Sequence, residues 1–358
     1  MNTLKCILSV ILLAGVSACN SGIDPITPVD AGNDVTPPEV TISYPLDGSL
    51  IQVVEDVATV VFKIEVVDDI EISEIVMQLD GASIATFNSF KDYRRAVENF
   101  TYSNVTNGEH TLTVTATDLS GKSASRSVGF EKVPPYKPKF DGEIFYMPFD
   151  GDFSDLVSIT AATVTGAPST NAEGVSGKAY AGALDSYLTF PTEGLLGSAF
   201  TAAFWYKLNT NPDRAGILTV SPVDAANPTA QNNRVAGFRF FREGSADSQT
   251  FKLNVGDGVN EYWFDGGEAA SLAPDGQWVH LAFTITGSES AVYINGEAVS
   301  KGANDGIGWD GCDIMTIASG APRYTGWSHL SDYSLMDELR IFNKALTQTE
   351  IKALMTAK

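Results

Sequence analysis

Cysteine and histidine are scarce in this chain, and their scarcity excludes two kinds of structure. The sequence contains three cysteines and three histidines. Cys6 and Cys19 lie near the N-terminus, so Cys312 has no partner in the rest of the chain and a disulfide framework is excluded. The histidines are far apart in the sequence, which excludes a metal cluster built from Cys and His.

Basic residues are also few. Lys and Arg total 23 against 44 Asp and Glu, which gives a formal net charge of −21. Nucleic-acid binding depends on cations that neutralise phosphates, so nucleic acid is excluded as a partner. Beyond the N-terminal segment no apolar run has the ~20 residues of a membrane-spanning helix. The excess of carboxylates instead suits an exposed exterior surface and supplies oxygen ligands for calcium.

The first residues have the order of a bacterial export signal. Lys5 precedes an apolar run from Ile7 to Leu13, and Val16-Ser17-Ala18-Cys19 follows. A cysteine after small residues resembles the lipobox that lipoprotein signal peptidase cleaves. The resemblance implies that residues 1–18 are removed and that Cys19 carries the lipid that anchors the protein to a membrane. An ordinary secretory signal with a chance cysteine is the alternative.

Proline-rich segments divide the rest of the chain into two domains. Residues 19–37 combine prolines with small polar residues, which predicts a tether without a core. Residues 134–140 begin Pro134-Pro135 and are interpreted as a linker. The linker separates residues 38–133 from residues 141–358, and each part is long enough to bury its own core.

Residues 38–133 alternate apolar and polar side chains as strands do. Phe62, Ile64 and Val66 face one way, and Lys63 and Glu65 face the other. The pattern predicts a small antiparallel sandwich. The segments that resemble bacterial immunoglobulin-like domains, which usually act as spacers, are Pro37–Ile42, Tyr44–Gly48, Val67–Asp69 and Asn107–Asp118.

Residues 141–358 are also rich in strand patterns and Gly-containing turns. Five stretches, in this order and spacing, resemble the concanavalin-A-like jelly roll of the laminin-G-like superfamily, a fold that hosts many functions. We therefore predict an all-β protein in which an immunoglobulin-like sandwich precedes a jelly roll. The five stretches are Phe145–Gly151, Gly174–Ala179, Phe200–Trp205, Gln277–Glu297 and Met336–Leu346.

The hydrophobic period changes near the C-terminus. Thr347 and Glu350 have the spacing of a capping box, and Leu346 and Ile351 can pack across it. Ile351 and Leu354 then lie on one apolar face at helical spacing. The sequence predicts a short helix after the last strand.

Paired catalytic carboxylates are missing from the larger domain. Glycosidases need two carboxylates close together, and sandwich enzymes place them on one strand. Glu243 and Asp247 lie in a Gly/Ser loop, and Asp265 and Glu268 flank two glycines. We assign no catalytic residue, although an enzyme whose acids meet only in the folded structure stays an alternative.

Two acids match positions at which the resembling superfamily often binds a structural calcium ion. Asp150 ends the first stretch before Gly151, and Asp337 precedes the last strand. Asp152 is close enough to assist. A calcium ion takes ~6–8 oxygen ligands, which these carboxylates with carbonyls and water would supply. The alternative is that the acids cap turns through backbone N–H groups.

Three tryptophans lie outside the shared pattern, among loop residues with polar neighbours. Sugar rings stack on aromatic side chains while polar groups bond the hydroxyls, so these loops predict a glycan platform. Trp309 is the first choice, because its Gly-rich loop is expected to leave the indole accessible. The alternative is that each tryptophan covers an end of the sandwich. The predicted ligand-binding residues are Trp309, Trp327, Tyr324, Arg323, Asp310, Asn304, Trp263 and Tyr262.

The order of anchor, tether, spacer and jelly roll resembles the accessory glycan-binding lipoproteins of Bacteroidetes. That resemblance implies a surface-exposed, lipid-anchored protein of the outer membrane that captures polysaccharide or oligosaccharide beside an outer-membrane transporter. Two other functions stay open. The jelly roll of an adhesion or scaffold protein would bind a protein partner, and a glycan-active enzyme would cleave its ligand.

Overall fold

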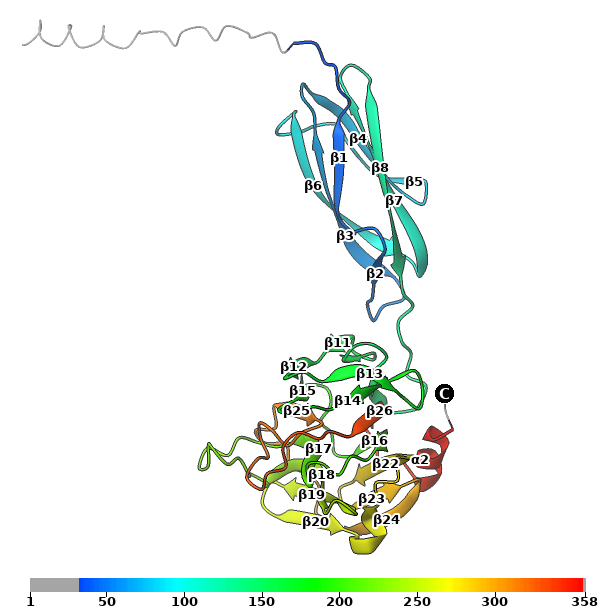
Figure 1. Ribbon diagram of the computed structural model, residues 1–358. Coiled ribbons are helices and arrows are strands. Elements are labelled where there is room, and N and C mark those ends of the chain that lie inside the picture. Colours follow the sequence, from blue (N-terminus) through cyan, green and yellow to red (C-terminus); the bar gives the residue numbers. More distant parts are fainter. Residues whose placement is uncertain (1–31, 357–358) are drawn as a thin grey trace, which may run out of the picture. The chain divides into compact units, whose positions relative to one another are not determined.

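The structure is a computed structural model that describes residues 32–356, and it divides into two compact units (Figure 1). The smaller unit contains residues 32–51 and 57–132, and the larger unit contains residues 52–56 and 133–356. The predicted signal peptide, Cys19 and most of the tether lie outside the described residues. No helix in residues 32–356 is long and apolar enough to span a membrane.

The smaller unit is a sandwich of two sheets, as predicted. A sheet in the order β1-β3-β6 is accompanied by a five-stranded sheet in the order β2-β8-β7-β4-β5. Only the β2–β8 pair is parallel among the described strands of this unit. The strands are β1 (Glu39–Tyr44), β2 (Ser49–Ile51), β3 (Ala58–Val67), β4 (Ile72–Leu79), β5 (Ala82–Phe87), β6 (Arg95–Val105), β7 (Gly108–Asp118) and β8 (Ser123–Lys132).

Period-two alternation builds the core of this unit. Phe62, Ile64 and Val66 on β3 are buried, while Lys63 is exposed. A one-residue slip of register would turn the apolar side chains toward water, so burial of one face fixes the pairing. The Asp80-Gly81 turn joins β4 to β5, and both residues have positive φ, as a type I′ hairpin requires. The predicted sandwich of residues 38–133 is confirmed as a fold.

The larger unit contains two eight-stranded sheets, which we name the β18 sheet and the β16 sheet. The β18 sheet has the order β12-β15-β25-β17-β18-β19-β20, with β21 paired to β19. Its strands are β12 (Thr163–Thr165), β15 (Tyr187–Pro191), β17 (Arg214–Val220), β18 (Ala236–Gly244), β19 (Gln249–Asp257), β20 (Glu261–Asp265), β21 (Ser271–Leu272) and β25 (Ile314–Ile317).

The β16 sheet has the order β13-β14-β26-β16-β22-β23-β24, with β9 paired to β26. A separate hairpin pairs β10 (Ser154–Asp155) with β11 (Thr160–Ala161), and one 3-10 turn, η1, spans Gly267–Ala270. The strands of the β16 sheet are β9 (Glu143–Met147), β13 (Ser169–Glu173), β14 (Lys178–Ala181), β16 (Phe200–Lys207), β22 (Trp278–Ile285), β23 (Glu289–Ile294), β24 (Glu297–Ala303) and β26 (Leu335–Phe342).

The core of the larger unit lies between these sheets. Phe204 and Phe283 from the β16 sheet contribute to one buried cluster with Phe238 and Phe240 from the β18 sheet. The rings of Phe240 and Phe283 are 5.0 Å apart across the interface. Because each buried Phe side chain contributes about 1.5–3 kcal/mol by leaving water, this aromatic layer stabilises the larger unit.

A C-terminal helix, α2 (Gln348–Leu354), covers part of the outer face of the β16 sheet. Its predicted capping box is confirmed: the Thr347 hydroxyl accepts the Glu350 N–H at 3.3 Å, and Glu350 accepts the Thr347 N–H at 2.7 Å. The apolar stripe of the helix packs on small side chains of the strands, which let the helix approach closely. The cluster contains Ala203, Ala282, Ala291, Tyr293, Phe342, Leu346, Ile351 and Leu354.

The segment after Val133 packs on the larger unit. Tyr136 donates its hydroxyl to Glu143 at 3.0 Å and accepts the Arg340 guanidinium at 2.9 Å. The Arg340 guanidinium carbon lies 3.6 Å from the centre of the Tyr146 ring. The proline-rich segment is therefore held on the outer face of β9 and β26 by this network.

Candidate ligand-binding site

The outer face of the β18 sheet is covered by two loops rather than by a helix. On β18, Phe238 and Phe240 enter the core, so Arg239 and Phe241 point to the opposite face. The 221–235 loop follows β17 and the 318–334 loop precedes β26 (Figure 1, yellow-green and orange). The loops pair with each other, since Thr325 N–H donates to the Gln231 carbonyl at 2.8 Å. Side chains distant in sequence are thereby brought onto one face.

Two tryptophans lie side by side on this face. Trp263 comes from β20 and Trp327 from the 318–334 loop. Their ring planes are 11° apart and their centroids are separated by 6.1 Å. The exposed fractions are 40% for Trp263 and 44% for Trp327. The Trp263 ring packs nearly perpendicular to the buried Phe241 ring, with 6.1 Å between the ring centroids. We call Trp263 and Trp327 the tryptophan pair.

Arg234 lies against both rings of the tryptophan pair. Its guanidinium carbon is 4.8 Å from the Trp327 centroid and 5.6 Å from the Trp263 centroid. Glu261 binds the guanidinium in a bidentate manner, at 2.6 and 3.1 Å. These hydrogen bonds raise the pKa of Arg234 and lower the pKa of Glu261, so both groups stay charged. The ion pair fixes the position of the cation beside the rings.

A polar depression of about 410 Å³ adjoins the tryptophan pair and shares Arg234 and Glu261 with it. The Asn232 carbonyl oxygen, Oδ1, is buried without a hydrogen-bond partner in the described chain. The other lining residues are Asp224, Asn233, Val235, Val259 and Asn260.

A buried arginine holds the 221–235 loop in place. Arg239 is fully buried, and burial lowers its pKa to about 10, so it is still a cation at neutral pH. It donates to the carbonyls of Asn233 at 2.9 Å, Arg234 at 3.1 Å and Ala236. It also donates to Asn254 Oδ1 at 3.1 Å. These bonds set the backbone from which Arg234 reaches the rings.

A second arginine on β18 holds the 318–334 loop. Arg242 and Asp332 are 0% and 2% exposed and form an ion pair at 2.9 Å. Tyr206 donates its hydroxyl to the other Asp332 oxygen at 2.5 Å. Asp332 also accepts the Ser334 N–H at 3.1 Å. This buried network anchors the C-terminal end of the loop that carries Trp327.

The expectation of an accessible Trp309 indole is wrong. The Trp309 indole N–H donates to the Gly197 carbonyl at 2.9 Å, and the ring packs near the buried Phe200 and Phe238. The glycines of its loop bring the backbone close to the sheet, where Gly308 N–H donates to the Gly256 carbonyl at 2.8 Å. Trp309 is therefore partly buried and packs against the core of the larger unit.

Other residues predicted to bind ligand instead form hydrogen bonds, ion pairs or ring contacts within the protein. Tyr324 is fully buried and stacks on His329 at 5.0 Å, and Asn304 is buried and donates to Ser290 at 2.5 Å. Tyr262 donates its hydroxyl to Asp305 at 2.7 Å. Arg323 forms an ion pair with Asp313 at 2.8 Å, and Asp310 is exposed. Within residues 32–356, Trp263 and Trp327 are the two members of the predicted set whose side chains stack on each other.

Sequence reasoning missed the polar residues of the site. Arg234 and Asn232 lie in a polar loop without a motif, and Glu261 begins a strand next to the predicted Tyr262. The available signal was the run Asn232-Asn233-Arg234, because amides and guanidinium groups bond hydroxyls well. This run indicates a binding site only once the fold places the loop beside the two tryptophans.

The acids predicted to bind calcium contact backbone N–H groups. Asp337 accepts Val175 N–H at 2.6 Å and Ser176 N–H at 3.0 Å, while Asp150 accepts Lys178 N–H at 2.7 Å. Both carboxylates approach the turn between β13 and β14 so closely that any side chain at Gly174 or Gly177 would collide with them. Both acids therefore cap the turn between β13 and β14, as the alternative interpretation expects.

The three acids do not gather into one calcium site. Asp152 accepts Ser154 N–H at 2.9 Å, and no three His, Cys, Asp or Glu side chains in residues 32–356 are placed to hold a metal ion. Asp337 nevertheless has one buried oxygen without a partner in the described chain, and burial raises its pKa to about 7. A calcium ion would satisfy that oxygen, so binding by Asp150 and Asp337 stays a prediction.

Calcium binding by Asp150 and Asp337 predicts a melting temperature that depends on calcium. A ligand at one hundred times its Kd stabilises the folded state by about 2.7 kcal/mol, so a chelator should lower the melting temperature of the larger unit. The effect should be larger at pH 8 than at pH 6, because Asp337 is ionised above its pKa of about 7. Differential scanning calorimetry with calcium and with a chelator measures it. Equal melting at both pH values would leave turn capping as the role of these acids.

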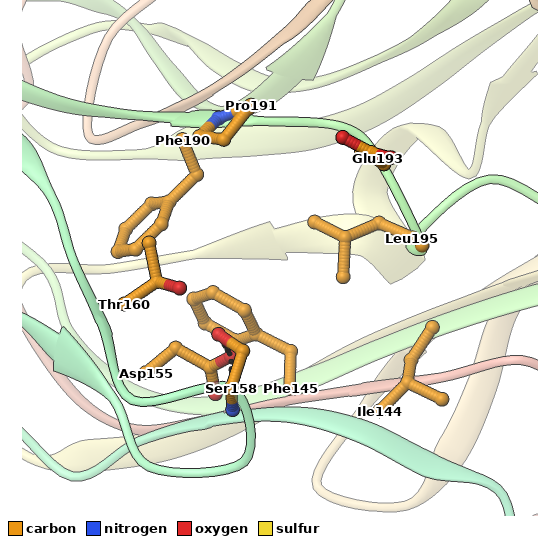
Figure 2. Close-up of a pocket in the computed structure, with 10 residues that line it drawn as sticks. Ile144, Phe145, Asp155, Ser158, Thr160, Phe190, Pro191, Glu193 and Leu195 are labelled. Atoms are coloured by element: carbon orange, nitrogen blue, oxygen red, sulfur yellow. Dashed lines mark hydrogen bonds between the residues drawn. The ribbon is translucent and has the colours of Figure 1, made fainter. Parts of the chain in front are cut away.

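A second cavity of about 330 Å³ opens near β9 and β15 (Figure 2). Asp155 lines it, but its carboxylate accepts Tyr146 N–H at 2.9 Å and the Ser158 hydroxyl at 2.5 Å. Phe145 and Phe190 point into the space in Figure 2, yet both are almost fully buried. The cavity therefore offers little aromatic surface and a carboxylate already used to hold a turn.

Comparison with known families identifies the two folds. Residues 38–114 match the bacterial Ig domain, and residues 181–352 match the concanavalin A-like lectin/glucanases superfamily. The chain thus carries a bacterial immunoglobulin-like domain followed by a concanavalin-A-like domain. Both resemblances and the predicted fold class are confirmed at this level. A search of curated proteins found no match.

Several solved structures resemble part of the chain. Domain 4 of an extracellular arabinanase from Geobacillus stearothermophilus, solved with arabinotriose, is 22% identical over 59% of this chain and 97% of its own, with a TM-score of 0.45. The binding domain of Paraclostridial Mosquitocidal Protein 1 is 16% identical, covering 60% of this chain and 52% of its own, with a TM-score of 0.43. This chain therefore spans about half the length of that toxin domain.

Proposed function

We propose that the chain binds an oligosaccharide or polysaccharide, without cleaving it, at the tryptophan pair and the adjoining depression. The observation that carries the proposal is the pair itself. Two nearly parallel indole rings, each about two-fifths exposed, form an aromatic surface beside polar groups. Sugar C–H faces stack on such a surface while hydroxyl groups bond the polar side chains. Membership of a lectin/glucanase superfamily supports the same ligand class.

Binding without catalysis is supported by the state of the acids near the site. Glu261 is paired with Arg234, and Glu243 and Asp265 share Lys252 at 3.0 and 2.7 Å. The pKa values of all three carboxyls are lowered, so none holds a proton to donate at neutral pH. Asp337 has the raised pKa of a general acid, but it is fully buried against a turn that a substrate cannot enter.

A protein partner is the second candidate, and one observation favours it. Val235 and Val259 line the same depression and are 40% and 83% exposed. Val223, whose carbonyl accepts the Asn233 side-chain amide, is 51% exposed. Exposed aliphatic side chains beside aromatic ones are common at protein interfaces. An adhesion or scaffold role would use this surface.

Titration with glycans tests the proposal. The full chain should bind a member of a bacterial, plant and host polysaccharide panel with micromolar to millimolar affinity. Trp327→Ala and Trp263→Ala should each weaken binding at least about fivefold, because truncating such an aromatic contact typically costs more than ~1 kcal/mol. Trp309→Phe is the matched control, and its affinity should be unchanged. An affinity that neither tryptophan substitution changes, or no binding to any glycan, would favour the protein-binding alternative.

The site would be presented outside the cell. We propose that Cys19 is lipidated, that the protein is anchored in the outer membrane with its surface exposed, and that it acts beside an outer-membrane transporter. The immunoglobulin-like unit would serve as a spacer. The support is the sequence pattern at Cys19 and the order of the two domains.

Removal of the lipidation site provides a direct test of the anchor. Cys19→Ala should either release the protein from the membrane fraction or block its processing, because the acyl chains supply the membrane affinity. Fractionation and intact mass spectrometry measure both outcomes. A variant with the wild-type mass that stays in the membrane fraction would rule out a lipid anchor at this residue.

A further inference from the structure

We infer that the ligand of the tryptophan pair is an uncharged glycan rather than a uronate, sialylated or sulfated one, an inference that rests on the proposed function. Acidic glycans carry fixed negative charges, and a site that selects them needs a cation free to bond each charge.

Both cations of the site are already engaged. Arg234 is bound by Glu261 in a bidentate manner, and Arg239 is buried and donates to carbonyl, amide and hydroxyl oxygens of the protein. The next cation on this face, Lys252, lies between Glu243 and Asp265. A carboxylate or sulfate would have to displace one of these partners.

The charged side chains that line the depression have no positive excess. Arg234 is the one cation among the lining residues, and the carboxylates of Glu261 and Asp224 stand against it. The hydrogen bonds from Asn227 and Asn232 lower the pKa of Asp224 and keep it ionised. At longer range the net charge of −21 repels anions. An acidic glycan thus meets no net attraction at short range and a repulsion at long range.

Carboxylates supply part of the polar lining of the depression. The Asp224 and Glu261 carboxylates accept hydrogen bonds and cannot donate them. Sugar hydroxyls donate to such groups, whereas the oxygens of a sulfate or carboxylate do not. A cationic ligand is also disfavoured, since Arg234 already occupies the cation position against both rings. Uncharged hydroxyl-rich sugars fit this combination.

Matched pairs of glycans that differ in charge provide the test. The full chain is titrated with dextran and dextran sulfate, with methyl-esterified and de-esterified homogalacturonan, with lactose and sialyllactose, and with carboxyl-reduced and native hyaluronan. At least one neutral member should bind, and its charged counterpart should bind at least about tenfold more weakly, which is 1.4 kcal/mol. A charged member that binds as tightly as its neutral counterpart, and loses affinity in Trp327→Ala, would overturn this inference and leave glycan binding intact. No binding by any member would overturn both.

Glu261→Gln tests the same point without knowledge of the natural sugar. The substitution keeps the shape of the side chain but releases the Arg234 cation. Affinity for dextran sulfate should rise about tenfold, in the range of one hydrogen bond to a charged group. Glu289→Gln, which removes an exposed partner of Lys301 on β24, is the matched control. An unchanged affinity for dextran sulfate in Glu261→Gln would show that the ion pair does not set the charge preference.

Discussion

Asp332→Ala should lower the free energy of unfolding of the larger unit by about 3–5 kcal/mol, the cost typical of leaving a buried ion without its partner. The change leaves the Arg242 guanidinium buried without a carboxylate and removes the acceptor of the Tyr206 hydroxyl. All five tryptophans lie in the larger unit, so denaturant unfolding followed by tryptophan fluorescence reports on this unit. Asp332→Asn should cost less, because the amide still accepts one hydrogen bond.

Asp310→Ala is the matched control for this substitution. Asp310 is an exposed acid in the loop before β25, and its removal should change the unfolding free energy by less than about 0.5 kcal/mol. If Asp332→Ala were as mild as its control, the Arg242–Asp332 network would not be the anchor of the 318–334 loop. The loop would then owe its position to Tyr324 and His329.

Acid should destabilise the larger unit through His280. This side chain is buried beside Trp205, at 5.3 Å between ring centroids, and burial lowers its pKa to about 4. The unfolded chain takes up the proton near the ordinary pKa of 6.5, and the folded chain resists protonation down to about 4. Stability is therefore full above pH 6.5 and falls as the pH drops toward 4, by about 3 kcal/mol in total at 1.36 kcal/mol per pH unit.

His280→Phe isolates that contribution from those of other titrating groups. The His280 Nδ1 atom has no hydrogen-bond partner in the described chain, so a phenyl ring loses no bond there. The stability difference between wild type and variant, measured in denaturant at pH 7, 5.5 and 4, should shift by about 3 kcal/mol in favour of the variant. A difference that stays constant over this range would contradict a neutral, buried His280.

Local patterns predicted the elements of both units. The alternation on β3 and the capping box of α2 depend on residues within a few positions of each other, so periodicity and spacing suffice. The immunoglobulin-like and concanavalin-A-like folds followed from motifs in a fixed order. Those features are local, or they recur across a superfamily.

The site was predicted only in part, because it is made by contacts between distant segments. Trp263 and Trp327 were both among the predicted residues, but their neighbour Arg234 reaches them through the pairing of two loops. The indole of Trp309 is less accessible than expected, because glycines that suggested an open loop instead allowed close packing on the sheet. Composition of a loop does not decide which way its aromatic side chain turns.

The burial of Arg239 and Arg242 could not be predicted from the sequence. Charged residues in a strand are usually exposed to solvent, so Arg239 and Arg242 would be expected at the surface in the run Phe238-Arg239-Phe240-Phe241-Arg242. Their burial depends on loop carbonyls and on Asp332, which come from two other segments. The preorganisation of the site therefore follows from tertiary structure alone.

The indole N–H signals of the five tryptophans report directly on where a glycan binds. When the full chain is titrated with a glycan that it binds, the heteronuclear NMR signals of Trp263 and Trp327 should shift or broaden together. The Trp309 signal should stay in place, because its N–H is bonded to the Gly197 carbonyl. Single tryptophan-to-phenylalanine variants assign the signals. If Trp309, Trp205 or Trp278 responded and the tryptophan pair did not, the ligand would bind elsewhere and the proposed site would be wrong.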